Sequence, residues 1–266
     1  MSDDPLRERW ARLRAARRAA VIPYVTAGYP DLAATRAFLA GAEAAGADVV
    51  ELGVPWSDPV ADGPVIQAST HAAIEGGTTL ANSLDVLAAE RPALPVVVFT
   101  YLNPILAMGP EAFARRAKAA GAAGVLVTDL PVGADPAVEA AIGASGLPLV
   151  RLVAPTTSGE RLRLVAAASR GFVYLVSRLG VTGTETGPGA EVAARVAAVR
   201  AVTDLPVAVG FGIRDGAQAA LAARLADGVV VGSAIVERMR AAGAAGGLAL
   251  VAELRAAVDA ARREAA

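Results

Sequence analysis

Three acidic residues stand close together in the stretch VVELGVPWSDPVADGP, residues 49–64. Glu51 lies inside an apolar run, and Asp58 and Asp62 follow it. Burying an unpaired carboxylate is so costly that the group usually takes up a proton instead. Partial burial at the end of a strand would therefore raise the pKa of Glu51 toward the range in which a general acid or base works.

Each of these acids also has a structural interpretation. Glu51 could form an ion pair with an arginine, for which Arg151 and Arg178 are candidates, and its position favours neither reading. Asp-Pro and Asp-Gly pairs are ordinary turn chemistry, and Asp58 fits an Asx-turn well. Asp62 is more ambiguous, because a second carboxylate near the first would allow two proton transfers at different atoms of one substrate.

The rest of the composition argues against several other catalytic mechanisms. The only lysine is Lys118 and the only histidine is His71, and the chain has no cysteine. Lys118 falls in a helical segment, so a Schiff-base mechanism has no nucleophile on a strand. A zinc or iron site draws on several histidine or cysteine ligands, and we expect His71 on a helix surface instead. Carboxylates, tyrosines and hydroxyls remain for proton transfer.

Short β-branched runs alternate with Ala/Leu/Arg segments of helical period, and this alternation predicts a parallel sheet. About eight such units favour closure into an α/β fold, a (β/α)8 TIM barrel, which typically needs about 250 residues. We expect one domain over residues 1–266, with an extra N-terminal helix in the Arg/Ala stretch 7–19. The predicted strands are 20–28, 47–54, 95–102, 124–130, 148–155, 171–177, 206–212 and 227–233.

Polar residues and glycines gather where the predicted strands end, and in barrels that end carries the active site. Two long loops, 54–65 and 178–189, leave from the same face, and we interpret them as lids or interaction surfaces. The segments GVTG, GFG and GSA follow the last three strands, where barrels often bind phosphate through backbone N–H groups. Glycine can also simply end a strand, but together these segments favour a phosphorylated substrate.

Composition and net charge limit the classes of partner that this chain can be expected to bind. The chain has 266 residues, 55% of them hydrophobic, a mean hydropathy of +0.47 and a net charge of −1. Every apolar run is broken short of the ~20 residues that a membrane-spanning helix requires. A near-neutral charge argues against nucleic acid as a partner. With no cysteine and no apolar segment after the acidic N-terminus, we expect a cytoplasmic protein.

Six motifs appear in order along nearly the whole chain: PYVTAGYP, ELGVPWSDPVADGPVIQAS, YLNP, SRLGVTGT, GFGI and ADGVVVGSAIV. Together they resemble the tryptophan synthase alpha subunit family. The resemblance implies a (β/α)8 barrel that cleaves indole-3-glycerol phosphate to indole and D-glyceraldehyde 3-phosphate. It implies no cofactor in this chain, and a beta subunit that carries pyridoxal phosphate, receives the indole and forms an alpha2-beta2 complex.

The resemblance also assigns roles to single residues. Glu51 matches the general acid/base that protonates indole C3 and deprotonates the glycerol hydroxyl, and Asp62 matches the carboxylate at the indole nitrogen. The other matches are an indole pocket of Tyr24, Phe99, Tyr101, Tyr174 and Thr182, a phosphate-binding set of Gly183, Phe211, Gly212, Gly232 and Ser233, and a partner-facing loop containing Pro55 and Asp58. Core packing is the alternative for the aromatic residues, above all for Phe99.

The chain departs from the family pattern at Ala72, at Leu179 and over Thr184–Thr186. These departures bear on loop closure and on coupling to the beta subunit. Two alternatives therefore stay open. One is a free-standing lyase of the same reaction, and the other is a regulatory partner that binds the phosphate ligand with little turnover.

Overall fold

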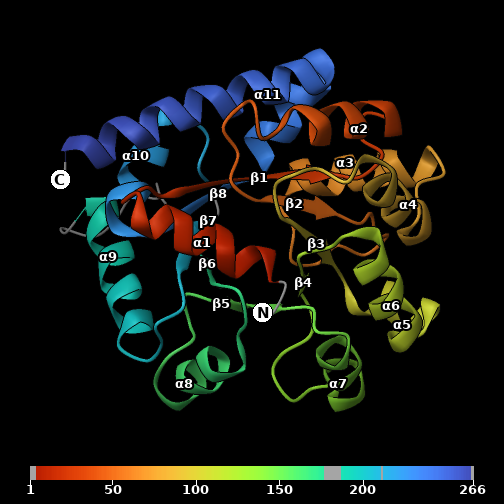
Figure 1. The fold of residues 1–266 in the computed structure, drawn as a ribbon, viewed down its shortest axis with the longest axis horizontal. Helices are drawn as coiled ribbons and strands as arrows, with labels where there is room; N and C mark the ends of the chain where they lie inside the picture. The colour runs from red at the N-terminus through yellow and green to blue at the C-terminus, as the bar shows by residue number, and fades with distance from the viewer. Residues whose placement is uncertain (1–3, 177–186, 211, 265–266) are drawn as a thin grey trace.

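Eight parallel strands close into a barrel in chain order (Figure 1). The computed structural model describes residues 4–176, 187–210 and 212–264. Its topology confirms the predicted (β/α)8 barrel. The strands are β1 Ala20–Thr26, β2 Val50–Gly53, β3 Val96–Thr100, β4 Gly124–Val127, β5 Leu149–Val153, β6 Val173–Val176, β7 Val207–Gly210 and β8 Gly228–Val231.

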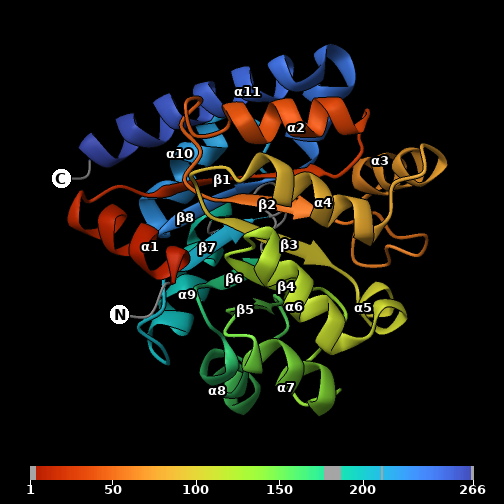
Figure 2. The same cartoon turned by 45° about the vertical axis from the view of Figure 1, so that its right-hand side comes forward.

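Helices surround the barrel and cover the outer face of its strands (Figures 1 and 2). They are α1 Pro5–Ala15, α2 Leu32–Gly41, α3 Pro64–Glu75, α4 Leu80–Glu90, α5 Leu102–Met108, α6 Pro110–Ala120, α7 Pro136–Ala144, α8 Gly159–Ala168, α9 Gly187–Arg200, α10 Gly216–Leu225 and α11 Ser233–Glu264.

The strands separate two apolar layers, because successive side chains of a strand point to opposite faces. One layer packs between the strands and the outer helices and includes Val50, Leu52 and Val98. The other fills the barrel interior and includes Val49 and Val97. Glu51 follows Val49 at a spacing of two, so the alternation directs its side chain to the interior.

Helix α1 closes the N-terminal end of the barrel, and it confirms the predicted extra helix. Asp4 caps it by accepting a hydrogen bond from the Arg7 N–H (3.0 Å), which satisfies one of the free donors of the first turn. Leu6, Trp10 and Leu13 lie on one face and pack into the interior layer. In Figure 1 the helix lies across the end of the barrel.

Helix α11 is the longest element, with 32 residues, and by length and composition it could cross a membrane. The sequence analysis predicted no segment of that kind. The backbone is not helical at Ala242 and Gly243, so two helices meet there at a kink. Leu250, Leu254 and Val258 are buried, and the helix packs against α2, α10 and β1 (Figures 1 and 2). These contacts place α11 in the layer of helices that surrounds the barrel.

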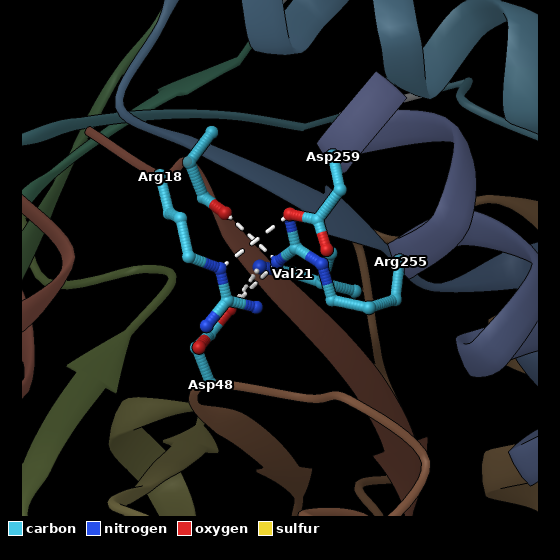
Figure 3. Close-up of polar contacts among 6 residues, drawn as sticks. Arg18, Val21, Asp48, Arg255 and Asp259 are labelled. Carbon is cyan, nitrogen blue, oxygen red and sulfur yellow. Dashed lines mark hydrogen bonds and ion pairs between the residues drawn. The ribbon is translucent and has the colours of Figure 1, made fainter. Parts of the chain in front are cut away.

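A buried ion-pair cluster ties α11 to the first two strands (Figure 3). The Arg255 guanidinium lies 3.1 Å from the Asp48 carboxylate, and it donates to the Ala19 carbonyl (2.9 Å) and to Asp259. Asp48 also accepts from the Val21 N–H at 2.9 Å. Burial raises the pKa of Asp48, while the Val21 hydrogen bond and the Arg255 charge oppose that rise. The last helix is thereby joined to the start of β1 and to Asp48, two residues before β2.

The structure describes the first of the two predicted long loops in full, but only the last residues of the second. The loop after β2 runs over residues 54–63 and ends two residues before the predicted limit, because Pro64 occupies the first position of α3. Proline suits that position, where its missing N–H has no helical partner to lose. Most of the loop 178–189 lies outside the described residues, and residues 187–189 begin α9.

Candidate active site

A cavity opens at the carboxyl ends of the strands, the face on which polar residues were predicted to gather. The volume of this cavity, as bounded by the described residues, is about 120 Å³. Five of the predicted positions on β1, β2, β3, β6 and the loop before α3 line it, together with three after β7 and β8. They are Tyr24, Glu51, Asp62, Phe99 and Tyr174, with Gly212, Gly232 and Ser233.

The Glu51 carboxyl group lies at the bottom of this cavity with almost no solvent contact. The residue is 1% exposed and pairs in register with Tyr24 of β1 and Val97 of β3. Its Oε1 atom has no hydrogen-bond partner among the described residues. Desolvation raises the pKa of Glu51 to about 8, so the carboxyl is largely protonated at neutral pH. It can therefore act as a proton donor.

Arg151, a candidate ion-pair partner for Glu51, is engaged elsewhere. Its side chain lies 2.8 Å from the Glu139 carboxylate of α7 and donates to the Leu130 carbonyl at 2.9 Å. The alternation of β5 explains this, because Arg151 shares a face with Leu149 and Val153, which belong to the outer apolar layer. Arg178, the other candidate, lies outside the described residues.

Asp62 reaches the same cavity from the loop before α3. The Tyr101 hydroxyl donates to its Oδ2 atom at 2.8 Å, and the Ala61 N–H donates to the Tyr101 oxygen at 3.1 Å. The Gln67 amide donates to the Asp62 backbone carbonyl at 2.9 Å, which anchors the loop to α3. Burial raises the pKa of Asp62 to about 6, against the opposing effect of the Tyr101 hydrogen bond. Asp62 is therefore mostly ionised at neutral pH.

Two buried tyrosines form part of the cavity wall, and two glycines make room for them. A β-carbon on Gly53 would lie 2.1 Å from the Tyr24 hydroxyl oxygen, and one on Gly210 would lie 2.3 Å from that of Tyr174. Burial raises the pKa of both phenols well above the ordinary value, so they stay neutral. The ring of Tyr24 meets Phe99 edge to face, with centroids 5.2 Å apart. The result is a flat apolar slot beside Glu51.

Tyr101, predicted in the indole pocket, is not among the residues that line the cavity. It follows β3, is 3% exposed, and lies behind Asp62 as that carboxylate's hydrogen-bond donor. Its geometry is that of a residue that positions Asp62.

Several residues at the cavity escaped the sequence analysis. Gly63, Ile66, Ile213 and Arg214 line it, although none belongs to a strand end. Behind the wall, the Thr26 and Ser69 hydroxyl oxygens lie 2.7 Å apart, and Thr26 donates to the Tyr24 oxygen at 3.3 Å. Thr26 could be found from the sequence, because it is a polar residue at a strand end. Ser69 could not be found in this way, because only the packing of α3 on β1 brings it behind the cavity wall.

The predicted phosphate-binding residues stand where β7 and β8 end. Gly212 follows β7, Gly232 follows β8, and Ser233 is the first residue of α11. Free backbone N–H groups at a helix start favour an anion. Thr182, Gly183 and Phe211 lie outside the described residues, as do Leu179 and Thr184–Thr186.

The residues predicted to face a partner lie apart from the cavity. Pro55 is buried in the loop after β2, and Asp58 is exposed and accepts from the Ser57 hydroxyl at 2.6 Å. Val60 in the same loop is 81% exposed, a high value for a large apolar side chain. His71 lies on the surface of α3 beside Glu75, as the sequence analysis expected.

Within the described residues there is no group of three or more His, Asp or Glu side chains placed to hold a metal ion. What the cavity offers is one protonated and one ionised carboxyl group, a flat apolar slot, and glycines with a helix start nearby. Fold and site together define a (β/α)8-barrel enzyme of the acid/base type.

Comparison with known proteins identifies the family. The family model for the tryptophan synthase alpha chain matches residues 10–262, so the chain belongs to this family. Curated alpha chains from Caulobacter sp. (strain K31) and Gloeobacter violaceus are 46% and 50% identical, covering 91% and 88% of this chain and 89% and 86% of their own.

Solved structures agree. Tryptophan synthase from M. tuberculosis in its aminoacrylate-bound form superposes with a TM-score of 0.87 at 40% identity, covering 96% of this chain and 99% of that one. The alpha subunit from Legionella pneumophila gives 0.90 at 33% identity, covering 97% and 100%.

Proposed function

We propose that this chain cleaves indole-3-glycerol phosphate in the cavity at the carboxyl ends of its strands, with Glu51 and Asp62 as the acid/base pair. The reaction is the one that its family catalyses, and it yields indole and D-glyceraldehyde 3-phosphate. The observation that carries the residue assignment is the pairing of a buried, protonated Glu51 with an ionised Asp62 on one cavity.

The chemistry follows from those two protonation states. Glu51 gives its proton to C3 of the indole ring, and the ring becomes a cationic indolenine. The Asp62 carboxylate accepts a hydrogen bond from the ring N–H and stabilises that cation. Glu51, now a carboxylate, takes the proton of the glycerol hydroxyl. The C–C bond to the ring then breaks, its electron pair neutralises the indolenine, and indole and the aldehyde leave.

The apolar slot and the glycine set divide the remaining work. Tyr24, Phe99 and Tyr174 suit the flat indole ring, because all three are aromatic and the phenols of Tyr24 and Tyr174 are neutral. Gly212, Gly232 and Ser233 suit the phosphate through backbone N–H groups and one hydroxyl. Thr182, Gly183 and Phe211 complete these two sets in the proposal. The chemistry uses only side chains of this protein, as expected for an alpha chain.

The beta subunit is the partner of this chain and carries the pyridoxal phosphate that converts indole to tryptophan. We propose that the loop containing Pro55 and Asp58 belongs to the contact with it, supported by the exposure of Asp58 and Val60 in that loop. We also propose that residues 1–266 form one domain, that the assembly is an alpha2-beta2 tetramer, and that the enzyme works in the cytoplasm.

Substitution of the two carboxyl groups tests the mechanism. We expect Glu51→Gln and Asp62→Asn each to lower kcat for indole release by roughly 10²-fold or more, because neither amide can exchange a proton or carry the charge. Glu111→Gln, a matched change of an exposed acid in the first turn of α6, should retain kcat. The measurement is steady-state indole release by the complex with the beta subunit, with circular dichroism to check folding. Parent-like turnover in Glu51→Gln or Asp62→Asn would refute the acid-pair mechanism.

A further inference from the structure

A second polar cavity lies at the opposite end of the barrel, beneath helix α1. It measures about 320 Å³ and is bounded by α1 and the turn after it, by the residue before β8, and by the end of α11. Four arginines line it: Arg14, Arg17, Arg18 and Arg262. This is the N-terminal face, so the cavity is separate from the one that contains Glu51.

The charges around this cavity do not balance among the described residues. Asp227 is the single carboxylate in the lining, so four positive groups face one negative group. Its two oxygens are already engaged, one with Arg200 at 3.0 Å and the other with the Val207 N–H at 2.9 Å. The lining therefore has a net excess of positive charge.

Contacts with the protein hold three of the four guanidinium groups in place. Arg14 donates to the Asp204 carbonyl at 3.3 Å, and Arg262 donates to the Ala226 carbonyl at 2.6 Å. Arg18 lies 3.4 Å from Asp259, which Arg255 also contacts. A guanidinium has five donor hydrogens, so each of these groups keeps donors for a ligand.

Two buried donors at this cavity have no hydrogen-bond partner among the described residues. They are the Trp10 indole Nε1 and the Arg262 Nε. Trp10 is 5% exposed, and buried polar groups are normally hydrogen-bonded. Both residues line the cavity, but neither nitrogen is itself accessible from it, so an acceptor bound there would reach them only after a side-chain shift.

An adjoining cavity of about 830 Å³ shares Trp10, Arg14 and Pro206 with the first. Leu147, Pro148 and Leu205 contribute apolar surface to it. The two spaces meet at α1, and the adjoining cavity combines this apolar surface with Arg7, Arg170 and Asp4.

We propose that the N-terminal end of the barrel binds a phosphate group among Arg14, Arg17, Arg18 and Arg262. A phosphate dianion carries enough acceptor oxygens and charge to meet several guanidinium groups at once. The source can be free phosphate or a phosphate monoester whose organic part occupies the adjoining cavity. This site is independent of the lyase reaction and of the residues proposed for it.

Trp10 provides the reporter that tests the proposal. The chain has two tryptophans, and the other, Trp56, lies in the loop after β2 at the opposite face. In the full chain with Trp56→Phe, we expect sodium phosphate at constant ionic strength to produce a saturable change in Trp10 fluorescence. Phenyl phosphate titrated in parallel distinguishes the sources: tighter binding than phosphate identifies a monoester, and equal binding identifies the free ion.

Matched arginine variants separate this site from the active-site phosphate. Arg17 is exposed and forms no ion pair among the described residues, so Arg17→Gln should fold normally. It should weaken phosphate binding at Trp10 by roughly fivefold, the effect of one partly exposed charge. Arg115→Gln, an equal charge change on exposed α6, should leave binding unchanged. A flat titration up to about 50 mM phosphate, or equal weakening by both variants, would overturn the proposal.

Discussion

Glu51 and Asp62 differ in how their carboxyl groups are surrounded, and this difference separates their protonation states. Glu51 has burial and no compensating hydrogen bond at Oε1, whereas Asp62 has burial offset by the Tyr101 hydroxyl. The pKa of Glu51 is about 8 and that of Asp62 is about 6, so at a pH between these values the pair holds one proton, on Glu51. Environment, rather than residue type, therefore assigns the donor and the anion.

The pH dependence of activity follows from this pair. Cleavage needs Asp62 ionised, so the rate falls as pH drops below about 6, and it needs Glu51 protonated, so the rate falls as pH rises above about 8. We expect a bell-shaped plot of kcat/KM for indole-3-glycerol phosphate with its maximum near neutrality. A rate that keeps rising above pH 8 would show that ionised Glu51 is the active form.

Tyr101 gives a second prediction at this scale. In Tyr101→Phe the Asp62 carboxylate loses its 2.8 Å hydrogen bond, and that bond is what opposes the rise in its pKa. We expect the acidic limb of the pH profile to move to higher pH while the alkaline limb stays in place. A role in substrate packing alone would raise KM and leave both limbs unmoved. Tyr29→Phe, at a tyrosine outside this pair, is the control.

At the scale of strands and helices, two glycines decide how closely the tyrosines approach the strands. Gly53 ends β2, and a β-carbon there would come within 2.1 Å of the Tyr24 oxygen. Because the barrel interior is close-packed, the ring could not move away without displacing Phe99. The glycine is therefore a packing requirement of the site.

We expect Gly53→Ala to destabilise the fold by about 1–3 kcal/mol, the usual cost of overpacking. Gly143 lies in α7 with open space around it, so Gly143→Ala should instead stabilise by about 0.5–1 kcal/mol. Urea denaturation of both variants measures the difference. Similar changes in the two would mean that Tyr24 relocates freely.

The periodicity of the sequence could predict most of the elements, because strands buried on both faces stand out as apolar runs between helical segments. The strand ends were less well defined: the run 95–102 ends at Thr100, because Tyr101 is the N-cap of α5. Glu51 was predictable from its place in such a run. Arg214 and Ser69 were not, since only the packing of distant elements brings them to the cavity or behind its wall.

At the scale of the whole molecule, the cluster around Arg255 fastens the chain's last helix to its first strands (Figure 3). The Arg255 and Asp48 side chains are only 9% and 4% exposed. A buried pair adds little net stability, but removing one partner leaves the other charge without compensation. Removing one member of the cluster therefore lowers the stability of the fold by more than the intact cluster adds to it.

We expect Arg255→Met to lower the free energy of unfolding by about 3 kcal/mol, because Asp48 is left buried without its cation. Adding Asp48→Asn to that variant should recover part of the loss. Arg263→Met, at an exposed site on the same helix, should change stability by less than about 0.5 kcal/mol. Guanidinium denaturation gives the double-mutant cycle, and additive losses would show that the two residues are not coupled.

The Arg255 cluster also has a consequence for synthesis on the ribosome. Asp48 leaves the exit tunnel long before the guanidinium that pairs with it, which lies 207 positions further along the sequence. Until then Asp48 has only the more distant charges of Arg18 and Arg9, which precede it in the chain. The ion pair therefore forms only after Arg255 has been made, and a shortened product that stops before Arg255 leaves Asp48 without this partner.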